Sequence, residues 1–261
     1  MVHVIAHSRG ARVKWRALMK AVKRETRRAR ATAMDRSSAE HRMMTRAPEV
    51  RWLERGDGPS VVLLHDLLRH MHDWDDVLDR LSVTVRAIAP EFPLFDPALQ
   101  SLSIGGLARW LDTTLDALAV EQAVLVGHGL GGYVALEFAL ASPTRTIALM
   151  LTGLGSDDER GANPDRVVQP RLRALARAMA RYSVGGATAR LSVPTLLVFG
   201  GRDHMVFPDR AARRAAHHDP SIAVVPDWGQ TPMVEQPDAF AAVTRAWIAR
   251  AALVRRSLRV G

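Results

Sequence analysis

The chain has 261 residues, 48% of them hydrophobic and 24% charged, a composition that can bury a sizeable core and excludes a disordered or fibrous protein. No apolar run approaches the length of about 20 residues that a membrane-spanning helix needs, and the absence of cysteine excludes disulfides, thiolate metal sites and cysteine nucleophiles. The net charge of +9 lies in residues 1–50, which carry 13 Lys and Arg against four acids, so the rest of the chain is balanced.

The first 48 residues form a predicted basic arm. Four apolar residues recur there at helical spacing and predict a short basic amphipathic helix: Trp15, Leu18, Met19 and Val22. Residues 27–45 have no apolar period and are predicted to be a solvated linker. The arm either lacks a dedicated partner or contacts an anionic surface or an acidic partner, and no motif beside it indicates specific nucleic-acid binding. We expect a cytoplasmic protein without a cleaved signal peptide, and peripheral association with a membrane through the arm stays open.

From Glu49 onwards, short continuous apolar runs alternate with helical segments. The predicted strands are 61–64, 83–89, 123–126, 146–151, 195–199 and 222–225, with a further strand or hairpin arm at 49–55. The predicted helices are 74–81, 104–119, 130–141, 171–182, 208–217 and 238–253. Continuous apolar runs are typical of strands covered on both faces, so the pattern predicts an α/β fold, a mostly parallel sheet flanked by helices on both faces. The predicted domain spans residues 49–253, and residues 254–261 form a basic tail.

A glycine-rich turn follows the strand predicted at 123–126. The sequence Gly127-His128-Gly129-Leu130-Gly131-Gly132 leads directly into a helix. Glycines at these positions suit either a dinucleotide-binding G-x-G-x-x-G turn or the sharp G-x-S-x-G turn that presents a nucleophile. The first alternative also needs an acid about 20 residues further on, at the end of the next strand, where this chain has Leu151-Thr152-Gly153. The surroundings therefore favour the second.

Three more landmarks, the first made of two adjacent segments, occur in a fixed order around this turn. Before it lie Gly56-Asp57-Gly58-Pro59 and Val61-Val62-Leu63-Leu64-His65-Asp66; after it lie Pro194-Thr195-Leu196-Leu197-Val198-Phe199-Gly200-Gly201-Arg202-Asp203 and Pro226-Asp227-Trp228-Gly229-Gln230-Thr231-Pro232. In this order and at these intervals, residues 49–250 resemble the α/β-hydrolase superfamily, in its epoxide-hydrolase-like and esterase-like branch. The resemblance implies an α/β-hydrolase fold.

The resemblance also assigns the positions of a catalytic triad. The nucleophile position is Gly129, the acid position is Asp203 and the base position is Gln230. Glycine has no side chain to attack with, and an amide neither accepts nor releases a proton near neutral pH. Only the acid is present, so the sequence predicts a degenerate triad in which ordinary ester or epoxide hydrolysis does not operate.

The implied oxyanion hole is altered as well. Its backbone donors are expected at Leu67 and Leu130. Asp66 stands where the family usually has glycine and is predicted to place a carboxylate beside the point where negative charge would develop. The expected pocket residues are His65, Asp66, His128 and Trp228, with His128 in a structural role. Because glycine relieves the backbone strain of such a turn, we expect Gly129→Ser to cost about 1 kcal/mol of stability without creating activity.

Other candidates weigh less. His65, Asp66, His70, His72 and Asp73 could form half of a metal site, but we expect solvated loop there, with Asp73 capping the next helix, and neither a metal nor a cofactor. His204 could replace the missing base. His217-His218 suits a helix end. The cap insertion, about residues 155–190, has room for one helix with an arginine edge at Arg173, Arg177 and Arg181, either solvated or clamping an acidic ligand.

These observations leave three functional hypotheses. The first is a pseudoenzyme that lacks the nucleophile and the base and binds a small apolar ligand or a protein partner in the former pocket. The second is an enzyme with atypical chemistry on a small apolar substrate, such as water-mediated hydrolysis or a lyase or cyclase reaction that uses Asp203, Asp66 or a nearby histidine. The third is an anchoring or scaffold protein whose arm carries the function. Fold alone does not choose among them.

Overall fold

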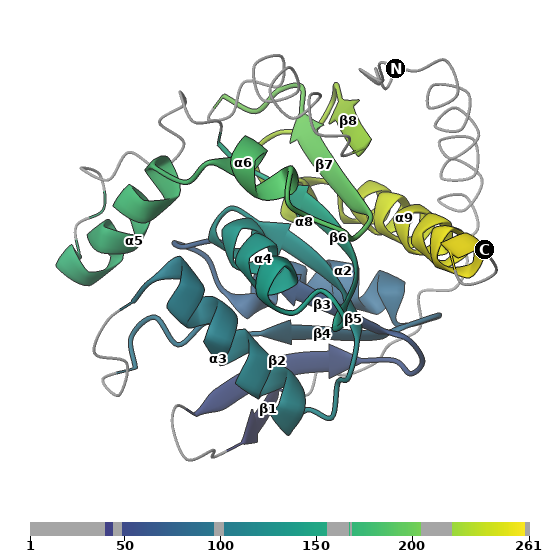
Figure 1. Ribbon diagram of the computed structural model, residues 1–261, viewed down its shortest axis with the longest axis horizontal. Helices are drawn as coiled ribbons and strands as arrows, with labels where there is room; N and C mark the ends of the chain where they lie inside the picture. The colour runs from purple at the N-terminus through teal and green to yellow at the C-terminus, as the bar shows by residue number, and fades with distance from the viewer. Residues whose placement is uncertain are drawn as a thin grey trace.

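A computed structural model describes residues 40–43, 49–96, 102–155, 167, 169–204 and 221–258. The described strands form one sheet of eight strands in the order β1-β2-β4-β3-β5-β6-β7-β8 (Figure 1). The strands are β1 (Glu40–Met43), β2 (Val50–Arg55), β3 (Ser60–Leu64), β4 (Arg86–Pro90), β5 (Ala123–His128), β6 (Thr146–Thr152), β7 (Thr195–Gly200) and β8 (Ser221–Val225). The helices are η1 (Met71–Trp74), α2 (Asp75–Leu81), α3 (Ile104–Ala117), α4 (Leu130–Ala141), α5 (Pro170–Ala180), α6 (Val184–Thr188), α8 (Pro232–Glu235) and α9 (Pro237–Leu258).

The direction of the strands decides where a site can form. From β4 to β8 all neighbouring strands are parallel, whereas β2 pairs antiparallel with β4 and β1 antiparallel with β2. The predicted mostly parallel sheet is confirmed. After β3 the chain continues to β4 on one side, and it then returns to place β5 on the other. The loops that follow β3 and β5 therefore diverge at the same edge of the sheet, which is where open α/β sheets bind ligands.

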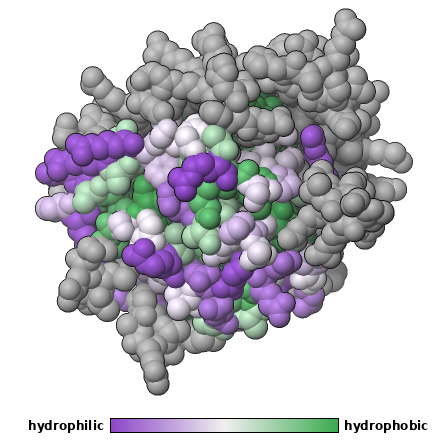
Figure 2. Space-filling model, viewed as in Figure 1, coloured by the Kyte–Doolittle hydropathy of each residue, from purple (hydrophilic) through white to green (hydrophobic). Residues whose placement is uncertain are grey.

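Alternating side chains of the strands build a core on each face of the sheet. Val62 and Leu64 of β3 pack in the cluster that includes α3, α4 and α5, and Val61 and Leu63 pack in the cluster that includes α2 and α9. This explains why the strands appear in the sequence as continuous apolar runs. On the outer face seen in Figure 2, hydrophilic and hydrophobic residues are interspersed over the described part. No described helix combines the length and the apolarity needed to span a bilayer.

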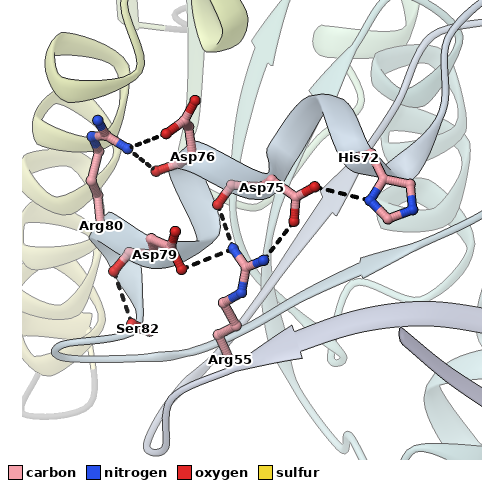
Figure 3. A network of polar contacts seen from close by, with 7 residues as sticks. All are labelled: Arg55, His72, Asp75, Asp76, Asp79, Arg80 and Ser82. Carbon is pink, nitrogen blue, oxygen red and sulfur yellow. Dashed lines mark hydrogen bonds and ion pairs between the residues drawn. The ribbon is translucent and has the colours of Figure 1, made fainter. Parts of the chain in front are cut away.

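Arginines attach α2 to its neighbours (Figure 3). The buried guanidinium of Arg55, at the end of β2, donates to the backbone oxygen and to Oδ1 of Asp75, both at 2.5 Å, and lies 3.0 Å from Oδ1 of Asp79. Arg80 contacts Asp76 on its own helix and Oδ1 of Asp238 at the start of α9, the latter at 2.5 Å. Each of these four acids in α2 and α9 is therefore paired with Arg55 or Arg80, and the ion pairs stabilise the fold.

The structure corrects several predicted boundaries. Residues 40–43 fall in the predicted solvated linker yet form β1, so the sheet begins before residue 49. The cap contains α6 as well as α5, and α9 continues to Leu258, into the predicted tail. Asp73 does not cap α2, because a 3-10 turn precedes that helix and its N-cap residue is Trp74. The predicted helices in the arm and at 208–217, and His217-His218, lie outside the described residues.

Glycines let the start of α4 pack directly against the sheet. Substitution of Gly131 tests this close approach. A Cβ built on Gly131 would lie within 3.0 Å of the backbone carbonyl of Leu64 in β3, whereas one on Gly185 in α6 would meet nothing within 4 Å. We expect Gly131→Ala to lower the free energy of unfolding by about 2–3 kcal/mol, because backbone must move. Gly185→Ala is the matched control and should be neutral or stabilising by up to about 1 kcal/mol. Equal effects of the two substitutions in urea unfolding would contradict the close approach.

Candidate functional site

The turn between β5 and α4 is a sharp strand-to-helix elbow centred on Gly129. Gly129 joins the last residue of β5 to the first residue of α4 with φ 51° and ψ −120°. Its N–H donates to the backbone oxygen of Thr152 at the end of β6, at 3.0 Å. A positive φ strains residues that carry a Cβ and costs glycine little, so the residue type fits the conformation.

The space above Gly129 holds the side chain of Asp66. A Cβ built on Gly129 would fall within 3.0 Å of Oδ1, Cγ and Oδ2 of Asp66, closer than real Cβ atoms approach. Oδ1 accepts a hydrogen bond of 2.7 Å from the N–H of Leu130, the first residue of α4. This is one of the two backbone groups that the sequence assigned to an oxyanion hole. A carboxylate at the positive end of a helix is stabilised there by the helix dipole.

His65 fixes the backbone of Asp66. Its imidazole is 1% exposed, Nε2 accepts from the N–H of Phe92 at 3.0 Å, and Nδ1 lies 2.8 Å from the backbone oxygen of Asp66. Because Nε2 is an acceptor, the neutral ring carries its proton on Nδ1 and donates it to Asp66. Burial lowers the pKa of His65, and the attraction of Glu91 offsets this only in part. His65 is therefore a neutral positioning residue.

His128 packs below the elbow. It is 3% exposed, and its Nδ1 is buried without a hydrogen-bond partner among the described residues. Burial lowers its pKa; the charges of Asp66 and Asp203 act in the opposite direction, and that of Arg69 reinforces the shift. The sequence expected a structural histidine here. The structure adds that burial is the main cause of its lowered pKa.

Asp203 comes to the same edge through the end of β7. It is 8% exposed, its N–H donates to the oxygen of Gly200 at 3.3 Å, and the N–H of Arg202 donates to Trp228 at 2.9 Å. This ties the acid position to the loop that follows β8. His204, the possible substitute base, is exposed.

The loop that carries Gln230 is held by a residue that sequence reasoning missed. The Glu235 carboxylate accepts from the N–H groups of Gly229 and Thr231 and from the Thr231 hydroxyl, at 3.1, 3.0 and 2.9 Å. Burial raises the pKa of Glu235, but these hydrogen bonds outweigh it and the pKa is lowered. Gln230 itself is exposed. Pro232 followed by an acid three residues later was the available signal, because both mark a helix start.

Trp228 and Leu67, two of the predicted site residues, are buried. Trp228 is buried and stacks on Phe240, in the core on the α9 face of the sheet, so it does not line the space above Gly129. Leu67, predicted to contribute its backbone N–H, is buried in the core cluster that also contains Leu130. Arg69 donates to the Asp73 carboxylate, and His72 contacts Asp75 at 2.9 Å. Over the ranges that the structure describes, no three acidic or histidine side chains gather as a metal site would require.

The chain is similar in sequence to a known protein family and to individual proteins. Residues 61–185 match the family described as "Alpha/beta hydrolase family". An uncharacterized protein of Mycobacterium tuberculosis is 30% identical over 103 residues, which cover 38% of this chain and 30% of that protein. The pimeloyl-[acyl-carrier protein] methyl ester esterase of Vibrio campbellii is 28% identical over 160 residues, 56% of this chain and 62% of that enzyme. The chain thus spans less than two thirds of the length of these relatives.

Solved structures show the same fold. A bacterial membrane phospholipase A superposes with a TM-score of 0.70 at 21% identity, over 92% of this chain and 93% of that one. MGS-MChE2, an α/β hydrolase from the metagenome of lagoon sediments of Mar Chica, Morocco, gives 0.68 at 24% identity, over 80% and 98%.

The contact between Asp66 and position 129 predicts coupled substitutions. We expect Gly129→Ser to lower the free energy of unfolding by about 2 kcal/mol or more, above the 1 kcal/mol expected from strain, because the new side chain must displace Asp66 from the Leu130 N–H. In an Asp66→Gly background the cost should fall to about 1 kcal/mol, the backbone strain alone. Chemical denaturation of the four proteins of this cycle measures the coupling. Equal costs in both backgrounds would contradict it.

The two buried histidines predict a pH dependence. Their pKa values are lowered in the folded protein, so below about pH 6.5 the unfolded chain binds protons that the folded chain does not, and stability decreases as the pH is lowered. Each contributes a slope of up to about 1.4 kcal/mol per pH unit between pH 6.5 and 5. His65→Gln and His128→Gln should each flatten the profile, and the exposed His70→Gln should leave it unchanged. A flat profile of the parent in this range would rule the interpretation out.

Proposed function

We propose that this chain, which belongs to the α/β-hydrolase superfamily, is a non-hydrolytic member that binds a small apolar ligand or a protein partner at the elbow. One observation carries the proposal: the Asp66 carboxylate lies where a nucleophile's side chain would project and accepts the Leu130 N–H at 2.7 Å. An attacking atom and a free oxyanion donor are the two things that acyl transfer needs at this point.

The argument depends on position and charge together. A substrate oxyanion would have to replace a carboxylate that is already hydrogen-bonded to Leu130 and to approach the second oxygen of that same anion. Like charges at this distance repel. Removal of a nucleophile or base alone costs triad enzymes a factor on the order of 10⁶ in rate, and Gly129 and Gln230 combine both changes.

The retained scaffold supports binding. His65 holds the backbone of Asp66, and Glu235 holds the loop that carries Gln230, although neither residue contributes to a triad. Such fixed elements keep a recognition surface in shape. The relatives named above include an ester hydrolase, and a shared fold does not transfer its activity.

A second candidate function is favoured by the groups that border the elbow. The carboxylate of Asp66 is partly exposed beside Gly129, and the ring of the buried His128 borders the same turn. A carboxylate can act as a general base toward water or a substrate carbon. In this reading the chain is an enzyme with atypical chemistry, and Asp66 is its catalytic base.

Turnover assays separate the two candidates. We expect the parent protein to hydrolyse no member of a panel of short- and medium-chain esters and thioesters above the rate in buffer, and Asp66→Asn to leave this unchanged. The matched positive arm is Asp66→Gly combined with Gly129→Ser and Gln230→His, which restores an attacking atom, a base and a free Leu130 N–H. Hydrolysis by the parent that disappears in Asp66→Asn would overturn the pseudoenzyme and establish the second candidate.

A further inference from the structure

The second oxygen of the Asp66 carboxylate is the polar group that the fold leaves available at the elbow. Oδ1 is engaged by the Leu130 N–H, while no hydrogen bond or ion pair within the described ranges engages Oδ2. The residue is partly exposed, so a ligand from solution can reach it. Asp66 is held by His65 through its backbone oxygen, which fixes the direction from which the carboxylate is approached.

The charges around Asp66 leave it unmatched within the described residues. The neighbouring cation, Arg69, donates to the Asp73 carboxylate, and none of the described ion pairs includes Asp66. Asp203, 8% exposed, is a second carboxylate that acts on His128 together with Asp66. At the N-terminus of α4 the fold thus presents a carboxylate, where an oxyanion hole would present only hydrogen-bond donors.

A buried imidazole beside the elbow is the second, independent observation. A Cβ on Gly153 would lie 2.5 Å from Cε1 of His128 and 3.3 Å from the N of Gly129, so the ring borders the turn. His128 is 3% exposed, and Nδ1 has no hydrogen-bond partner in the part of the chain that the structure covers. Buried polar atoms are normally satisfied, so this atom calls for a partner that the described residues do not supply.

We infer that Asp66 reverses the polarity of this site, so that it takes a ligand with a protonated amine in place of an acyl carbonyl. The inference deepens the proposed function and rests on it. A carboxylate oxygen accepts from an ammonium group in a short, charge-assisted hydrogen bond, whereas it repels a carboxylate. An ammonium carries three donors, one of which suffices for Oδ2 of Asp66.

Matched probes test the polarity directly. Hexylammonium, hexanol and hexanoate share one alkyl chain and differ in charge, and their binding to the full chain can be measured by calorimetry at low salt. We expect hexylammonium to bind most tightly. Hexanol should bind at least about tenfold more weakly, and hexanoate should not bind. Asp66→Asn keeps an oxygen for the Leu130 N–H and removes the charge, so it should weaken hexylammonium at least about tenfold. Asp57→Asn, an exposed acid in the turn before β3, is the control with the same change of charge and should bind as the parent does.

Each other outcome has a definite meaning. Hexanoate binding as tightly as hexylammonium, equal binding of hexylammonium by Asp66→Asn, or no binding of any probe would overturn the inference. Asp66→Gly frees the Leu130 N–H, so hexanoate should bind this variant, which shows that the helix terminus remains accessible. Ester hydrolysis by the parent would contradict the proposed function itself. The turnover assay therefore distinguishes failure of the proposed function from failure of the inference about ligand charge.

Discussion

The hydrogen bond from the Leu130 N–H to the Asp66 carboxylate is the interaction on which the site depends. It joins residues 64 positions apart and places a negative charge at the positive end of α4. A side chain at position 129 cannot occupy the same space, because its Cβ would overlap the carboxylate. Gly129 and Asp66 therefore form one structural unit, because the carboxylate of Asp66 occupies the space that a Cβ at position 129 would need.

This unit rests on the packing of the sheet. β3 and β5 are parallel neighbours with Leu64 opposite Gly127, so their following residues meet at the same edge. Gly131 lets α4 approach the backbone of Leu64, and the buried His65 links the Asp66 carbonyl to the loop after β4. The position of the Asp66 carboxylate is thus set by elements of the core.

The sequence predicted what depends on burial and local chain direction, and failed where backbone pairing or long-range contacts decide. Continuous apolar runs located β3, β5, β6 and β7 because both faces of those strands are covered. Glu40–Met43 escaped detection because an edge strand pairs through its backbone and, here, the Arg51–Glu40 ion pair, with no apolar pattern. Trp228 was placed at the elbow because a sequence cannot tell which side of a loop an aromatic ring packs on. Asp66 was correctly expected beside the oxyanion position, but its hydrogen bond to Leu130 needed the registry of two strands.

The same physical interaction has opposite consequences in catalysis and in binding. A backbone N–H at a helix terminus accelerates acyl transfer only if it binds the transition state more strongly than the ground state. In this chain a permanent carboxylate takes up that N–H in the resting protein, so its electrostatic energy contributes to the stability of the folded chain and is not held for a developing charge. The carboxylate of Asp66 is thereby held as a fixed hydrogen-bond acceptor at the N-terminus of α4. In the function that we propose, such a site selects ligands by their donors, and the absence of a side chain at Gly129 is what makes room for the carboxylate that recognises them.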